Sequence, residues 1–181
     1  MKRTGFAKMQ CPIARCLEQV GEWWTLLIVR DAFHGLRRFD EFEQSLGIAP
    51  NMLTRRLATL VKAGILEKRR YSQRPPRDEY VMTERGRDLQ PVLVAMQVWG
   101  NKHFAPEGPS VVLIDATTGA PADPVLVDRA TGRPIAHPDF VVKAGPAAGE
   151  ATRRKLERSA WANTIDRSEV PAVVAPRRRK S

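Results

Sequence analysis

Cysteine is scarce in this sequence, and it has no long hydrophobic run. Cys11 and Cys16 are the two cysteines among 181 residues, too few for a disulfide framework or a four-ligand zinc site. No apolar run approaches the roughly 20 residues that a membrane-spanning helix needs. The opening residues, MKRTGFAKMQ, lack the apolar segment of a secretory signal. These absences predict a protein of the reducing cytoplasm that does not associate with membranes.

Recognisable catalytic patterns are missing as well. No Ser/His/Asp spacing, Gly-rich phosphate loop or paired carboxylate setting stands out, and His34, His103 and His137 are widely separated. Each of these histidines is more typical of a surface or partly packed residue than of a metal ligand. We therefore expect a protein that is not an enzyme and that holds no cofactor and no metal.

Positive charge is what the sequence has in excess. It contains 30 Lys and Arg against 20 Asp and Glu, a net charge of +10, and 18 of the basic and 11 of the acidic residues fall within residues 1–105. Such an excess favours polyanionic partners, with simple solubility as the alternative. The terminal PRRRKS has no apolar anchor beside it, so we expect it to contact phosphate or RNA rather than a membrane.

The spacing of apolar residues predicts four helices in the first third of the chain. They cover residues 11–20, 23–32, 39–46 and 50–63. The second, WWTLLIVRDA, is apolar almost all round and should be the most buried. The fourth begins with Pro50 at its first position and ends before Gly64, as helices commonly do.

Two short alternating segments follow, and then another helix. Residues 65–71 and 79–83 read as strands joined by the exposed loop SQRPPRD, and a long helix runs from Thr83 to about His103. Helices three and four form a helix-turn-helix, and the hairpin is its wing. Residues 1–105 are thus predicted to be a winged helix-turn-helix domain, mainly α with a β-wing.

The pattern changes after residue 105. Two near-copies, LIDATTGAP and LVDRATGRP, lie thirteen residues apart. Each combines a short apolar strand with an Asp-x-x-Thr-Gly turn, which predicts a small all-β unit of two hairpins over residues 106–145, completed by residues 140–142. Residues 146–181 are rich in Ala, Pro and Arg, and we expect a basic tail, disordered apart from a short helix near residues 151–161.

The helix over residues 50–63 has two distinct faces. Leu53, Leu57, Leu60 and Val61 share one side, whereas Asn51, Arg55 and Lys62, with the short Ala58 and Thr59, share the other. Long donors near the start of a helix and small residues further along suit the DNA major groove, where Arg reads guanine and Asn reads adenine. An ordinary solvated face is the alternative.

The predicted DNA contacts come from three basic elements. They are Arg37 and Arg38 before the third helix, Asn51, Thr54, Arg55, Arg56 and Lys62 on the fourth, and Arg74 and Arg77 in the wing. We expect the fourth helix to read bases, apart from Arg56, which with Arg37 and Arg38 should hold phosphates. The wing should reach a minor groove or the flanking phosphates. The predicted partner is double-stranded DNA.

Three stretches within about residues 10–104 form a specific combination: CPIARCLEQVGEWWTLLIVRD, RRFDEFEQSLGIAPNMLTRRLATLVKAGILEKR and RPPRDEYVMTERG. Together they resemble the HxlR family of winged-helix transcription regulators, relatives of the MarR group. The resemblance implies a nucleoid-associated regulator that binds pseudo-palindromic operators as a homodimer, with repression by blocking polymerase as the default mechanism.

The resemblance also implies roles outside the DNA-binding face. The terminal helices would form the dimer interface, through Ile13, Leu17, Val92, Met96 and Trp99, for which core packing is the alternative. Cys11 falls where several family members carry a redox- or electrophile-sensing cysteine; an inert thiol is the alternative.

The sequence departs from the family pattern at several points. Glu22 stands where a lysine is usual, and Ala49 where a serine caps the helix. Some longer members carry a small ribbon with Cys-Gly knuckles. Here the corresponding turns read Thr118-Gly119 and Thr131-Gly132, which predicts a ribbon that has lost its metal.

A second function remains open from the sequence. The Trp23-Trp24 pair and the region of Trp99 could line an apolar pocket, although Trp23 and Trp99 could equally be core residues. The protein would then be a small-molecule- or redox-responsive module in which a ligand or partner controls weak DNA contact.

Overall fold

The structure is a computed structural model that describes residues 5–6, 8–136 and 139–158. The chain divides into two compact units, Met1–Pro124 and Val125–Ser181, and each is described here by itself. The predicted domain limits, 1–105, 106–145 and 146–181, stay predictions.

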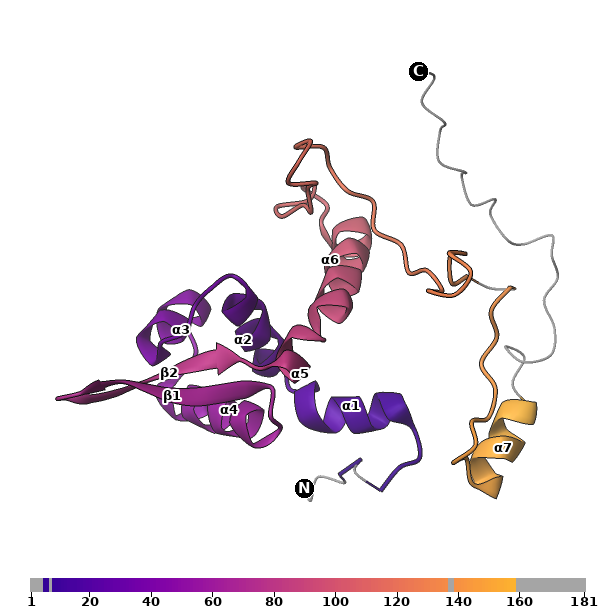
Figure 1. Ribbon diagram of the computed structural model, residues 1–181, viewed down its shortest axis with the longest axis horizontal. Coiled ribbons are helices and arrows are strands. Elements are labelled where there is room, and N and C mark those ends of the chain that lie inside the picture. The colour runs from indigo at the N-terminus through magenta and orange to yellow at the C-terminus, as the bar shows by residue number, and fades with distance from the viewer. Residues whose placement is uncertain (1–4, 7, 137–138, 159–181) are drawn as a thin grey trace. The chain divides into compact units, whose positions relative to one another are not determined.

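Two helices open the first unit, as the sequence predicts (Figure 1). α1 spans Pro12–Val20, with Pro12 in its first turn. α2 spans Trp23–Phe33 and has Ile28 and Val29 fully buried. It has four buried residues, more than any other helix of the described chain, although Trp23 at its start is 87% exposed.

The helix-turn-helix is confirmed. α3 spans Phe39–Leu46 and α4 spans Pro50–Lys62. Gly47 between them has a φ of 60°, a left-handed conformation that glycine adopts without strain. Leu53, Leu57 and Leu60 of α4 are fully buried against Phe42 and the core residues of α2. Each fully buried side chain of this size stabilises the fold by about 1.5–3 kcal/mol.

The wing is longer than predicted. β1 spans Leu66–Gln73 and β2 spans Pro76–Met82, paired antiparallel from Leu66 with Met82 to Gln73 with Pro76. The predicted seven-residue loop is therefore wrong: only Arg74 and Pro75, joined by a cis peptide bond, connect the strands. Backbone pairing continues through polar residues that carry no apolar alternation. The register shifts between Arg70 and Ser72, which leaves Tyr71 at a bulge.

The single long helix predicted after the wing is also wrong. α5 spans Glu84–Arg87 and α6 spans Gln90–Phe104. Pro91 explains the break, because proline lacks an N–H and its ring clashes with the carbonyl four residues earlier. The side-chain hydroxyl of Thr83 caps α5 by accepting the N–H of Gly86 at 3.0 Å.

The predicted all-β unit over residues 106–145 is not found. Its two Asp-x-x-Thr-Gly turns are each closed by one isolated bridge, Ile114 with Pro121 and Val127 with Pro134. The described residues of that region contain no strand. The turns are local: Asp115 accepts the N–H groups of Thr117 and Thr118, which needs no sheet.

The described residues of the second unit form one helix. α7 spans Glu150–Glu157 and overlaps the predicted helix near residues 151–161. The last three residues of that prediction, and the rest of the predicted basic tail up to PRRRKS, lie outside the described residues. Among the helices of the part that the structure describes, none is long and apolar enough to cross a membrane.

Candidate nucleic-acid interface

α4 presents a polar face opposite its buried leucines. We call the exposed residues Asn51, Thr54, Arg55, Ala58, Thr59 and Lys62 the polar face of α4. Leu53, Leu57 and Leu60 seat the opposite side of the helix in the core. The sequence predicts this division, and the structure places every predicted α4 residue except Arg56 at the surface.

Hydrogen bonds along α4 determine which polar groups remain available. The Thr54 hydroxyl donates to the carbonyl of Pro50 at 2.8 Å and the Thr59 hydroxyl to that of Arg55 at 2.9 Å. Both hydroxyls can still accept a hydrogen bond. The Asn51 carboxamide oxygen accepts the N–H of Met52 at 2.7 Å. A bidentate contact of Asn51 with adenine would therefore require its side chain to rotate.

The three basic residues of α4 differ in their surroundings. Arg55 and Lys62 are exposed, and neither side-chain cation makes a hydrogen bond or ion pair with the described residues. Arg56, by contrast, has a side chain only 15% exposed, and its Nη2 lies 2.9 Å from a carboxylate oxygen of Glu22. Sequence reasoning missed this pair, because 34 positions separate its members.

Hydrogen bonds to Glu41 hold the residues that precede α3. The backbone N–H groups of Arg37 and Arg38 donate to the Glu41 carboxylate at 2.8 and 2.9 Å. These bonds, from Arg37 first and then Arg38, hold the pKa of Glu41 below its ordinary value.

The same segment is bonded to the wing, because the carbonyl of Arg37 accepts the N–H of Tyr80 at 2.7 Å. Both arginines remain exposed.

Arg38 makes a further contact with the wing. Its guanidinium lies over the ring of Tyr71, 4.9 Å from the ring centroid, in cation–π geometry. Tyr71 is 40% exposed. The bulge brings this tyrosine beneath Arg38, which a sequence pattern of simple strand alternation could not predict.

The wing carries cations that pair with carboxylates and cations that do not, and the paired ones lie along its strands. Lys68 and Arg70 both pair with Asp78, at 2.9 and 2.6 Å, and Arg69 pairs with Glu67 at 3.0 Å. Hydrogen bonds from Lys68, and then from Arg70, lower the pKa of Asp78.

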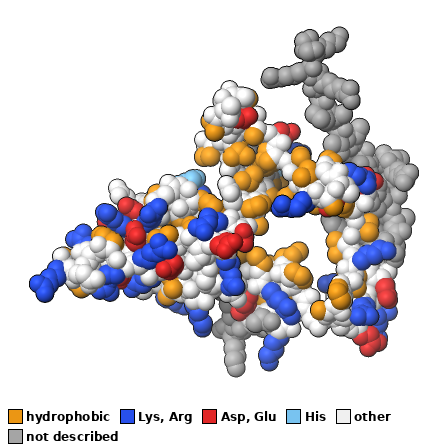
Figure 2. All heavy atoms as spheres, viewed as in Figure 1, with side chains coloured by type: hydrophobic (Ala, Val, Ile, Leu, Met, Phe, Trp, Pro, Cys, Tyr) orange, Lys and Arg blue, Asp and Glu red, His pale blue; other side chains and the backbone are white. Residues whose placement is uncertain are grey.

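At the tip of the wing, Arg74 and Arg77 are exposed. Their guanidinium groups make no hydrogen bond or ion pair within the described chain. Figure 2 shows Lys and Arg side chains over α3 and the wing, with acidic groups among them. The wing therefore offers free positive charge at its tip rather than along its length.

The predicted dimer-interface residues lie at the surface of the single chain. α6 has no buried residue, with Val92 43%, Met96 49% and Trp99 59% exposed. On α1, Ile13 is 72% and Leu17 47% exposed. Their alternative role as core residues is therefore wrong. Figure 2 shows hydrophobic side chains gathered over α6.

The tryptophans do not enclose a pocket in the single chain. Trp23 and Trp99 are exposed, so their assignment to the core is wrong, whereas Trp24 packs against the core. Two such exposed indoles cannot by themselves shield a small molecule from water.

Neither cysteine is bonded to another. Cys11 is half-buried at the N-cap of α1, and Cys16 is exposed. The sensing role of Cys11 stays a prediction. Across the described residues, no group of three His, Cys, Asp or Glu side chains could hold a metal.

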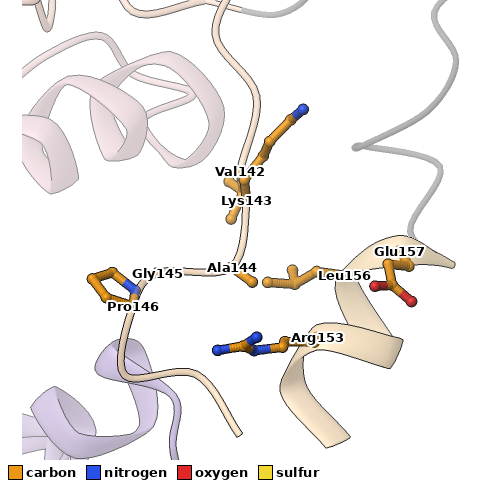
Figure 3. A pocket seen from close by; sticks show the side chains of 8 residues that line it. All are labelled: Val142, Lys143, Ala144, Gly145, Pro146, Arg153, Leu156 and Glu157. Atoms are coloured by element: carbon orange, nitrogen blue, oxygen red, sulfur yellow. The ribbon is translucent and has the colours of Figure 1, made fainter. Parts of the chain in front are cut away.

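The second unit contains a shallow hollow between α7 and the segment before it. Its volume is about 450 Å³, and Figure 3 shows Arg153 and Leu156 of α7 facing residues 144–146. The eight side chains that line it are exposed or half-buried. Arg153 already donates to the carbonyl of Ala148 at 2.9 Å. Nothing in this lining distinguishes a ligand site.

Comparison with known proteins agrees with this geometry. Residues 19–108 match the HxlR-like helix-turn-helix family. The chain is 42% identical over 135 residues to Rv3095 of Mycobacterium tuberculosis, an uncharacterised HTH-type transcriptional regulator, covering 74% of this chain and 85% of the relative.

Two solved structures are similar as well. PA1374 of Pseudomonas aeruginosa, a candidate transcription factor, is 55% identical with a TM-score of 0.59, over 81% of this chain and all of that one. PA1607, also a candidate transcription factor, is 40% identical with a TM-score of 0.70, over 78% of this chain and all of that one. With its helix-turn-helix, wing and exposed cations, the chain belongs to the HxlR-like helix-turn-helix family of transcriptional regulators.

Proposed function

We propose that the protein binds specific operator sequences and represses transcription by excluding polymerase. The polar face of α4 enters the major groove, where Arg55 reads guanine, Asn51 reads adenine, and Thr54 contacts a neighbouring base or its phosphate. Lys62, at the far end of the same face, contacts a base edge further along the groove. One observation carries this proposal: the exposed cations of α4, Arg55 and Lys62, are uncommitted, on a helix whose opposite side is buried in the core.

The flanking elements supply phosphate contacts. Arg37 and Arg38 precede α3, and their exposed side chains bind the backbone beside the groove. Arg74 and Arg77 at the wing tip bind the adjacent phosphates or enter the minor groove. The Tyr71 ring restrains Arg38 before DNA arrives, so less conformational entropy is lost on binding.

We propose further that the protein acts as a homodimer on pseudo-palindromic operators. Support comes from α6, a fifteen-residue helix without a buried residue. Contiguous apolar side chains on such a helix typically mark an interface. A two-fold dimer places two copies of α4 on successive turns of one DNA face, which requires operator half-sites about 34–36 Å apart.

A redox-responsive form of the same function is the alternative. It is favoured by two at least partly accessible thiols that are not bonded to each other, Cys11 at the N-cap of α1 and Cys16 on α1. The same helix carries Ile13 and Leu17 of the proposed interface. In this form, hypochlorite weakens operator binding by the wild type and not by Cys11→Ser, with Cys16→Ser as the matched control. Equal responses of all three proteins exclude Cys11 as the sensor.

The experiment that tests the main proposal is selection of bound duplexes from a random pool, followed by affinity measurements against salt. A two-fold symmetric motif with steep salt dependence is the expected result. Salt-dependent binding without a motif would make the protein a nonspecific DNA binder. No enrichment at all would contradict DNA binding by the protein alone.

A further inference from the structure

Arg56 is the basic residue of α4 that a carboxylate holds. Its Nη2 donates to Oε2 of Glu22 at 2.9 Å, and the two side chains are 15% and 29% exposed. Its neighbour Arg55 is exposed and makes no such pair. Adjacent arginines on one helix therefore have different roles available to them.

Glu22, which pairs with Arg56, lies at the start of a helix that is anchored in the core. Glu22 is the N-cap residue of α2, with an extended backbone just before the helix begins. Ile28 and Val29 of the same helix are fully buried. A hydrogen-bonded ion pair between Arg56 and Glu22 therefore links α4 directly to a helix anchored in the core.

Competition with phosphate disfavours a DNA contact by Arg56. A guanidinium has five N–H donors, so the bond to Glu22 alone does not exclude a phosphate. The Arg56 side chain is only 15% exposed, however, and would have to turn outward from Glu22 to reach one. The abandoned carboxylate would then remain near the negatively charged duplex, which is unfavourable. While the pair is intact, the acid cancels the charge that Arg56 would bring to the interface.

We propose that Arg56 is a positioning residue: held by Glu22, it fixes the placement of α4 relative to α2 and does not contact phosphate. This assignment rests on the proposed function, and it replaces the phosphate contact expected from the sequence. It divides the cations of α4 into an inner one that orients the helix and outer ones, Arg55 and Lys62, that face DNA.

Glu22→Gln separates this role from simple electrostatics. The substitution makes the protein more positive, so an electrostatic effect alone would tighten binding to every duplex. A positioning role predicts the opposite: affinity for the selected operator falls about tenfold, within the range of coupling found between neighbouring residues. All affinities are measured at a temperature at which melting curves show each variant fully folded.

Two further variants complete the test. Arg56→Gln should weaken operator binding to a similar extent while the slope of log K against log salt stays unchanged, because no phosphate contact is lost. Arg77→Gln, the control, should reduce the magnitude of that slope by about two, because each protomer of the dimer loses one phosphate contact. The exchanged pair Glu22→Arg with Arg56→Glu should restore affinity to within about threefold of wild type, since it re-forms the bridge.

The outcomes are distinguishable. A slope whose magnitude falls by about two in Arg56→Gln, with no rescue by the exchanged pair, would overturn the positioning role and restore the phosphate contact. Tighter binding by Glu22→Gln would overturn it as well. Wild-type protein that binds no selected duplex under any salt condition would instead overturn the proposed function itself.

Discussion

At the scale of single residues, a basic side chain is useful for DNA binding only if its charge is uncommitted. Arg69 and Arg70 resemble Arg74 and Arg77 in type and exposure, yet the first two pair with carboxylates of the wing. An exposed ion pair contributes only about 0–1 kcal/mol to stability. Phosphate groups could therefore still displace the carboxylates from Arg69 and Arg70. The unpaired arginines at the tip need no such exchange.

Arg55 and Arg77 should respond differently to removal of their side chains. Arg55→Ala is expected to lower affinity for the selected operator by about 1–3 kcal/mol and to relax preference at one base position, because it removes a base contact. Arg77→Ala should weaken all duplexes alike and reduce the magnitude of the salt slope by about two, one contact for each protomer of the dimer. Competition binding against operator and random DNA measures both. Identical effects of the two substitutions would argue against base reading by Arg55.

Glu41 makes a pH-dependent contribution to stability. Its pKa is lower in the folded protein than in the unfolded chain, because the N–H groups of Arg37 and then Arg38 donate to its carboxylate. The contribution is therefore present above the ordinary pKa of glutamate, about 4.3, and is lost as pH falls through the lowered folded value.

Urea denaturation of wild type and Glu41→Gln tests this dependence. Wild type should be the more stable of the two at pH 7, and the difference should shrink as pH falls below about 4. Glu43→Gln, from the same helix, is the control, since the Glu43 carboxylate makes no hydrogen bond within the described chain. A difference that is independent of pH would show that the charge of Glu41 plays no part.

At the scale of elements, the junction between the wing and α5 is tightly packed. A Cβ on Gly86 would overlap the carbonyl oxygen of Ile65. The Thr83 hydroxyl also donates to the carbonyl of Gly64 at 2.6 Å, near the end of α4. This crowding holds the base of the wing against the end of α4, so the two DNA-binding elements keep one relative placement.

Gly86→Ala should therefore destabilise the protein by about 1–3 kcal/mol, the usual cost of overpacking. Gly100→Ala is the matched control: space around Gly100 is open, and alanine there should be neutral or stabilise α6 by up to about 1 kcal/mol. Thermal melting of the two variants measures the difference. Equal melting temperatures would mean that the Ile65 segment moves aside without cost.

A charge placed on the exposed apolar side of α6 should dissociate the proposed dimer. Met96→Glu is expected to convert a dimer to monomers, because it would place a carboxylate inside an apolar interface without a partner. Lys102→Glu, also exposed on α6, is the control and should leave the dimer intact. Sedimentation equilibrium distinguishes the two. Wild type that is monomeric at all concentrations would exclude a dimer formed through α6.

At the scale of the whole molecule, net charge alone does not set DNA affinity. Of the cations described, we assign four per protomer to phosphates: Arg37, Arg38, Arg74 and Arg77. A dimer then makes about eight phosphate contacts, and each contributes about 0.9 to the salt dependence. We therefore expect log K to fall with log salt at a slope of about −7. A slope near −9 would indicate that Arg56 also contacts phosphate, and one near −3.5 would indicate a monomer.

The sequence by itself determined the helix-turn-helix and the wing, because both depend on local signals. Helical spacing of leucines, a proline at the start of α4 and a glycine at its turn act within a few residues of one another. The same signals placed Asn51 and Arg55 at the surface. Predictions from local patterns were wrong at Pro91, which breaks the single long helix predicted there. They were also wrong after residue 105, where the two Asp-x-x-Thr-Gly turns do not extend into strands.

Only the tertiary structure decided which charges are free. Glu22 meets Arg56 across 34 positions, and Asp78 meets Lys68 across the hairpin. The exposure of Trp23, and the meeting of Tyr71 with Arg38, depend likewise on how distant segments pack. Such pairings form because the fold brings residues that are far apart in the sequence close together in space. A periodic pattern places a side chain on a face of its own element, but the fold determines what lies opposite that face.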